Sequence, residues 1–104
     1  MREVDLAVFV AAHENGAVVI DVREPDEYES GHVPGARLIP VHRLSRHLGE
    51  VPLGQRVYLI CHAGNRSLAA AETLGRAGID AVSVAGGTVG WQRAGKPVTL
   101  GSRP

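Results

Sequence analysis

Cysteine is nearly absent from this sequence, which has a single one among 104 residues. An internal disulfide is therefore excluded, and a cysteine-rich metal site is disfavoured. No apolar run approaches the roughly 20 residues that span a bilayer, and the N-terminus lacks the basic and apolar sections of a signal peptide. Eleven basic and eleven acidic residues leave no net charge, so nothing in the composition indicates binding to nucleic acid or membrane. These absences predict a cytoplasmic protein.

The length of the chain allows one hydrophobic core and is too short for two. Its apolar fraction of 44% is ordinary for a globular protein. We expect one domain over residues 1–98 and a C-terminal tail over residues 99–104, with residues 101–104 loose.

Strand-like apolar runs alternate with helical patterns through most of the chain. Strands are predicted at residues 18–20, 36–39, 57–60 and 81–84. Helices are predicted after a cap at Asp5, from Pro25, over residues 41–48, from a start inside residues 61–67 through the alanine-rich residues 68–77, and after a cap at Thr88. This alternation predicts an α/β fold with a parallel sheet covered on both faces. Ligands of such sheets bind beyond the carboxyl ends of the strands.

The only cysteine stands at such a strand end and opens a short loop. The loop consists of Cys61, His62, Ala63, Gly64, Asn65, Arg66 and Ser67. If it folds around its first residue, the N–H groups of residues 63–67 and the start of the next helix converge on the sulfur. They would lower the pKa of the thiol and favour the nucleophilic thiolate. Such a cup suits transfer of a group from an anionic donor to sulfur, with Arg66 as a fixed charge at its rim.

Other loop residues have more than one interpretation. Gly64 and Asn65 would supply unusual backbone angles. His62 would either place partial positive charge near the sulfur or be solvated. Ser67 would either hydrogen-bond to the thiolate or cap the helix, and capping is favoured.

Three residues outside the loop are expected to support it. Asp21 and Arg23 lie at the end of a neighbouring strand, where they would form a structural pair that ties the sheet edge to the cysteine loop. Trp91 is assigned to core packing rather than to the pocket wall. No metal site is expected, because His42 and His47 would point about 140° apart on a helix.

Three segments together resemble the single-domain rhodaneses, the thiosulfate sulfurtransferase family. They are IDVREPDEY at residues 20–28 with GHVPGA at 31–36, CHAGNRS at 61–67, and GGTVGW at 86–91 with GKPV at 95–98. The resemblance implies a three-layer α/β/α domain with a central parallel sheet of about five strands. It further implies that Cys61 takes a sulfane sulfur from thiosulfate or a persulfide. The resulting persulfide would pass its outer sulfur to cyanide, a thiol or a protein, without a metal or organic cofactor.

Two other functions compete with sulfur transfer. Phosphatases and arsenate reductases of similar architecture have one more residue between cysteine and arginine, so the Cys-x4-Arg spacing favours sulfur transfer. The second alternative is a binding or sulfur-relay module whose protein partner donates or accepts the sulfur. In this loop, His62 and Ala63 stand where longer-studied rhodaneses have additional cations.

Overall fold

A single parallel sheet organises the chain, as expected. The computed structural model describes residues 2–104, so Met1, with which the predicted domain begins, lies outside the described residues. The sheet has the order β1-β5-β4-β2-β3. Its strands are β1 (Glu3–Val4), β2 (Val18–Asp21), β3 (Arg37–Leu38), β4 (Val57–Ile60) and β5 (Ala81–Val84). The central strand is β4, and the chain leaves its carboxyl end at Cys61.

Helices cover both faces of the sheet. They are α1 (Leu6–Glu14), α2 (Pro25–Glu29), α3 (Asn65–Arg76) and α4 (Gly87–Arg93), with two 3-10 helices, η1 (Val41–Arg46) and η2 (Leu48–Glu50). Side chains of β4 alternate between two apolar clusters, as the pleat of a strand requires. Leu59 packs in one cluster with Leu44 of η1 and Leu74 of α3. Tyr58 packs in the other with Phe9 of α1 and residues of α2 and α4. Both faces are therefore buried, which explains why β4 is apolar throughout.

Two of the predicted helix starts are confirmed. The Asp5 side chain accepts a hydrogen bond from Val8 N at 2.9 Å and caps α1. Pro25 occupies the first turn of α2, and Glu24 and Glu27 form a capping box around it. Glu27 is thereby held at the start of a short, rigid helix.

Other predicted boundaries were wrong. The strand β1 was not predicted, because two residues are too few to show an alternating apolar pattern. Its partner β5 is also far away in the sequence. The helix predicted over residues 41–48 is two 3-10 helices that meet at His47, and in η1 only Leu44 is buried. By contrast, α3 begins at Asn65, inside the cysteine loop, where a helix start was predicted. Thr88 lies inside α4, whose cap is Gly86.

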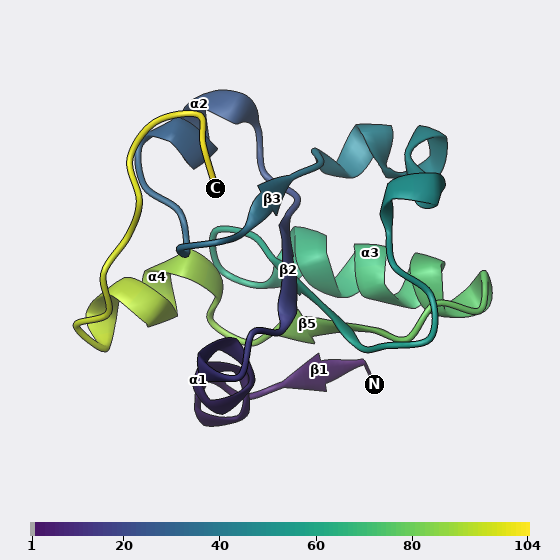
Figure 1. Ribbon diagram of the computed structural model, residues 1–104, viewed down its shortest axis with the longest axis horizontal. Coiled ribbons are helices and arrows are strands. Elements are labelled where there is room, and N and C mark those ends of the chain that lie inside the picture. Colours follow the sequence, from purple (N-terminus) through teal and green to yellow (C-terminus); the bar gives the residue numbers. More distant parts are fainter. Residues whose placement is uncertain (1) are drawn as a thin grey trace.

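The C-terminal segment is bonded to the end of α2. His32 and Thr99 form an antiparallel bridge, and Gly101 N donates to Glu29 O at 2.9 Å. The Arg103 carbonyl lies 2.7 Å from His32 Nε2. The expectation of a loose tail is therefore wrong at Gly101 and Arg103. Figure 1 shows this segment, in yellow, passing beside α2.

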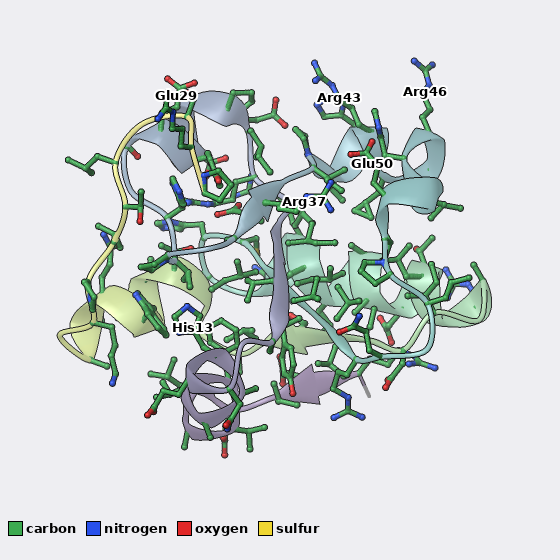
Figure 2. All side chains as sticks on the ribbon, in the orientation of Figure 1. His13, Glu29, Arg37, Arg43, Arg46 and Glu50 are labelled. Carbon is green, nitrogen blue, oxygen red and sulfur yellow. The ribbon has the colours of Figure 1, made fainter. Side chains whose placement is uncertain are left out.

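The 3-10 segment carries a charged outer surface. Arg43 and Arg46 are exposed and point away from the sheet (Figure 2). Arg37 of β3 instead pairs with Glu50 at 3.1 Å, which ties η2 to the edge of the sheet. Within residues 2–104, no helix has the length and apolar character needed to cross a membrane.

Candidate active site

The cysteine loop folds around its own first residue. Cys61 Sγ accepts hydrogen bonds from Gly64 N at 3.1 Å and Ser67 N at 3.4 Å. Gly64 has a φ of +110° and is the cap of α3, so the loop turns back through a conformation that favours glycine. The prediction of unusual backbone angles is wrong for Asn65, which is the first residue of α3 and has no positive φ. The sulfur consequently lies at the positive N-terminal end of α3.

Burial and hydrogen bonding act in opposite directions on the thiol. The Cys61 residue is only 1% exposed and belongs to the apolar cluster that contains Ala70 of α3. Burial raises the pKa of the thiol, but hydrogen bonds from the Ser67 hydroxyl and from the amides of Ser67, Gly64 and Arg66 outweigh it. The pKa of Cys61 is therefore lowered, and the thiolate is favoured.

The predicted loop residues divide between the mouth of the cup and its floor. Ala63 and Asn65 are exposed at the mouth, whereas Gly64 and Ser67 are buried with the sulfur. The His62 side chain is exposed, and its carbonyl accepts a hydrogen bond from Val89 N at 3.1 Å. Of the two interpretations of His62, the structure favours the solvated one.

The predicted free charge of Arg66 at the rim is instead paired with Glu27 of α2. The guanidinium donates to both carboxylate oxygens, at 2.8 and 2.9 Å. These hydrogen bonds lower the pKa of Glu27 to about 2, against the opposing effect of burial. Arg66 therefore contributes no unbalanced charge to the mouth. Glu27 was not predicted as a loop contact, because 39 positions separate it from Arg66.

Ser67 contacts the sulfur rather than capping the helix. The cap of α3 is Gly64, which has no side chain to offer, and Ser67 lies three residues further on. Its Oγ is 3.3 Å from Cys61 Sγ and 2.7 Å from Ser83 Oγ on β5. The favoured capping interpretation was wrong, and Ser83 is a site residue that its strand pattern did not distinguish.

Asp21 and Arg23 form the expected buried pair. Arg23 donates from Nη2 to Asp21 Oδ2 at 2.8 Å and from Nε to both carboxylate oxygens. The same Nη2 donates to Gly31 O at 2.9 Å. The pair thus joins the end of β2 to the turn after α2, and the side-chain hydrogen bonds of Arg23 go to Asp21 and to this turn rather than to the cysteine loop.

Trp91 is a core residue, as expected. It is 3% exposed, and its indole Nε1 donates to Pro97 O at 2.7 Å. It packs in the cluster of Phe9, on the opposite face of the sheet from the cluster of Cys61. Its support of the site is therefore indirect, through the placement of α4.

The N-terminus of α4 holds the cysteine loop from the β5 side. Thr88 donates to Cys61 O from N at 2.9 Å and from Oγ1 at 3.0 Å. A Cβ at Gly87 would lie 2.5 Å from Cys61 O and 2.6 Å from His62 O. Only glycine fits this close approach of two backbones, which explains part of the GGTVGW segment.

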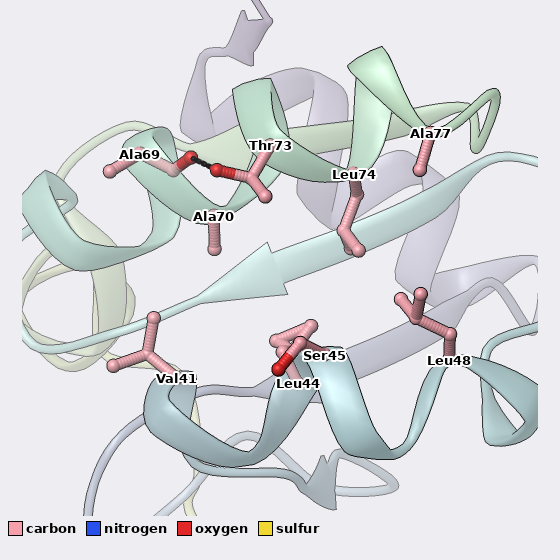
Figure 3. A pocket seen from close by; sticks show the side chains of 9 residues that line it. All are labelled: Val41, Leu44, Ser45, Leu48, Ala69, Ala70, Thr73, Leu74 and Ala77. Carbon is pink, nitrogen blue, oxygen red and sulfur yellow. Dashed lines mark hydrogen bonds between the residues drawn. The ribbon is translucent and has the colours of Figure 1, made fainter.

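An apolar groove lies between η1 and α3, on the same side of the sheet as Cys61 (Figure 3). Its walls are Val41, Leu44, Ser45 and Leu48 on one side and Ala69, Ala70, Thr73, Leu74 and Ala77 on the other. Across the described part of the chain, no cluster of three histidine, cysteine or acidic side chains could hold a metal ion.

The fold and the site together define the class of protein. It is an open parallel α/β domain with one cysteine in an amide-lined loop. The rhodanese-like domain family matches residues 6–94, so the chain belongs to this family. It is 36% identical over 83 residues to thiosulfate sulfurtransferase GlpE of Pseudomonas syringae, covering 79% of this chain and 78% of that protein. A rhodanese-related protein of Thermoplasma volcanium superposes with a TM-score of 0.89 at 33% identity, covering 96% and 99% of the two chains.

Some relatives are longer than this chain. YqhL of Bacillus subtilis is 42% identical over 76 residues, which cover 72% of this chain and 60% of YqhL. The family relationship supports sulfurtransferase chemistry in general terms.

Proposed function

We propose that the protein transfers a sulfane sulfur through a persulfide on Cys61. In the first half-reaction, the Cys61 thiolate attacks the outer sulfur of thiosulfate. A bond forms between the two sulfur atoms, the sulfur–sulfur bond of the donor breaks, and its electron pair leaves with sulfite. In the second, a thiophilic acceptor such as cyanide attacks the outer sulfur and leaves as thiocyanate, which regenerates the thiolate. Two half-reactions at one atom give ping-pong kinetics.

The observation that carries this proposal is the set of donors on Cys61 Sγ. Two amides and one hydroxyl lie within 3.1–3.4 Å of the sulfur and stabilise its negative charge. These donors stabilise the Cys61 thiolate before it attacks the sulfur donor. They stabilise it again when the acceptor takes the outer sulfur and the Cys61 thiolate departs as the leaving group. Residues 62–67 would bind the donor, and Asp21, Arg23 and Trp91 would hold the surrounding elements.

Burial of the sulfur supports transfer of a single terminal atom. Cys61 is 1% exposed beneath a mouth formed by exposed loop residues. A terminal sulfur can enter such a mouth while the rest of the donor stays outside. A phosphorus atom surrounded by four oxygens would have to bring those oxygens to the buried sulfur, so the burial of Cys61 disfavours phosphatase or arsenate chemistry.

A second candidate function is relay of sulfur from a persulfide on a small thiol or a protein. It is favoured by the pairing of Arg66 with Glu27, which leaves residues 62–66 without an unbalanced fixed cation for a dianion. A persulfide donor needs less positive charge than thiosulfate does. Its chemistry is the same, with a thiolate leaving in place of sulfite.

Mass spectrometry of the intact protein tests both candidates. Incubation with thiosulfate, or separately with a low-molecular-weight alkyl persulfide, should add about 32 Da, one sulfur, to the protein. Cyanide should remove the adduct, and Cys61→Ser should never acquire it. Loading by persulfide but not by thiosulfate would select the relay. The absence of an adduct with either donor would refute sulfur transfer by Cys61.

A further inference from the structure

Two buried hydroxyl groups form a chain behind the sulfur. Ser67 Oγ lies 2.7 Å from Ser83 Oγ and 3.3 Å from Cys61 Sγ, and both serines are fully buried. The Gly64 carbonyl is the other acceptor within reach, at 3.3 Å from Ser67 Oγ and 3.5 Å from Ser83 Oγ. The two serines therefore have two hydroxyl protons to donate. The possible acceptors are Cys61 Sγ, the Gly64 carbonyl and the hydroxyl oxygen of the other serine.

Ser83 occupies a position where an apolar side chain would be expected. Its neighbours Val82 and Val84 on β5 pack on one face of the sheet, and Ala81 packs on the other, which Ser83 also faces. A buried hydroxyl is unfavourable unless it is hydrogen-bonded, whereas alanine would be accommodated there without polar partners. The Ser83 hydroxyl thus has one short contact, and that contact is with the residue that touches the sulfur.

The direction of that short hydrogen bond decides what Ser67 can do. If Ser67 donates to Ser83, its only proton is used and the sulfur receives none from it. If Ser83 donates to Ser67, the Ser67 proton is free to point at the sulfur. A negative charge on Cys61 favours the second arrangement, because the chain of hydroxyls then ends on an anion and each bond polarises the next.

We propose that Ser83 is a positioning residue that donates to Ser67 Oγ and thereby turns the Ser67 hydroxyl toward the Cys61 thiolate. The purpose of this arrangement rests on the proposed function, but its direct effect is on the ionisation of the Cys61 thiol. When Cys61 carries the extra sulfur, the negative charge moves to the outer atom and Sγ becomes a weaker acceptor. The Ser67 proton can then turn to Gly64 O. The hydroxyl pair follows the charge state of the sulfur without movement of the backbone.

Alkylation of the single cysteine by neutral iodoacetamide, measured across pH, tests the proposal without any sulfur donor. Below the midpoint of the thiol titration, Ser67→Ala should lower the rate constant about tenfold and Ser83→Ala about threefold. The Ser67→Ala/Ser83→Ala double variant should equal Ser67→Ala alone, because Ser83 acts through Ser67. The ultraviolet absorbance of the thiolate should shift to higher pH in parallel. Ser83→Thr, which keeps the hydroxyl, should restore the wild-type profile.

Tyr28→Phe is the matched control, since it removes a buried hydroxyl that donates to Ala36 O rather than to Cys61 or its loop. It should lower stability and leave the pH profile in place. An unchanged profile in Ser83→Ala would overturn the proposal, as would additive effects of the two serine substitutions. If Ser67→Ala does not fold, the comparison of Ser83→Ala with Ser83→Thr decides the question. Failure of sulfur loading with an intact serine coupling would refute only the proposed function.

Discussion

The charge of Glu27 should make a pH-dependent contribution to the free energy of unfolding, and removing this charge should abolish that contribution. Glu27 accepts both hydrogen bonds of the Arg66 guanidinium, and its pKa falls from 4.5 to about 2. Taken at face value, that shift amounts to about 3 kcal/mol. The two side chains are 31% and 38% exposed, so solvent screening reduces the contribution to about 1 kcal/mol. We therefore expect Glu27→Gln to lower the free energy of unfolding by about 1 kcal/mol at neutral pH.

The sign of the pH dependence follows from the lowered pKa. The unfolded chain takes up the proton first, so the stabilisation is complete above about pH 5 and is lost as pH falls toward 2. Denaturant unfolding of wild type and Glu27→Gln should give curves that differ at pH 7 and converge near pH 2. Glu29→Gln, at an exposed position of the same helix, is the control. A difference that is independent of pH, or that grows in acid, would refute the reasoning.

Two further predictions concern the loop and its support. Arg66→Ala leaves Glu27 unbalanced at the mouth, so sulfur loading from thiosulfate should fall on the order of 10²-fold while alkylation by iodoacetamide changes little; equal losses in the two assays would assign Arg66 to the ionisation of Cys61 or to the fold. Gly87→Ala should lower the free energy of unfolding by about 2–3 kcal/mol because its Cβ would clash with two carbonyl oxygens. Gly78→Ala, which also has a positive φ but open space for a Cβ, should cost about 1 kcal/mol, and equal costs in denaturant unfolding would contradict the clash.

The parts of the site that are local in sequence could be predicted from it. The turn of the chain around Cys61 depends on Gly64 and on the start of α3, all within seven residues. The same is true of the Asp5 cap and of the Asp21–Arg23 pair. Each is a short-range arrangement in which residue type and spacing determine the geometry.

The missed features depend on contacts between distant segments. The strand β1 forms only by pairing with β5, and the Ser67 hydroxyl meets that of Ser83 across 16 positions. Thr88 likewise bonds to Cys61 O, in a contact that spans 27 positions. Pattern reasoning assigns such residues to the nearest helix end, since it has no access to the strand order.

The strand order explains why these distant contacts converge on one loop. The strand β4 lies between β2 and β5, so its carboxyl end has a neighbour on each side. The chain that continues from β2 forms α2 and supplies Glu27, which neutralises Arg66. The strand β5 supplies Ser83 behind the sulfur, and the start of α4 supplies Gly87, which packs against the backbone of the loop. The thiolate is therefore stabilised by groups from its own loop, while neighbouring elements fix the charge at the mouth and the direction of the hydroxyl behind it.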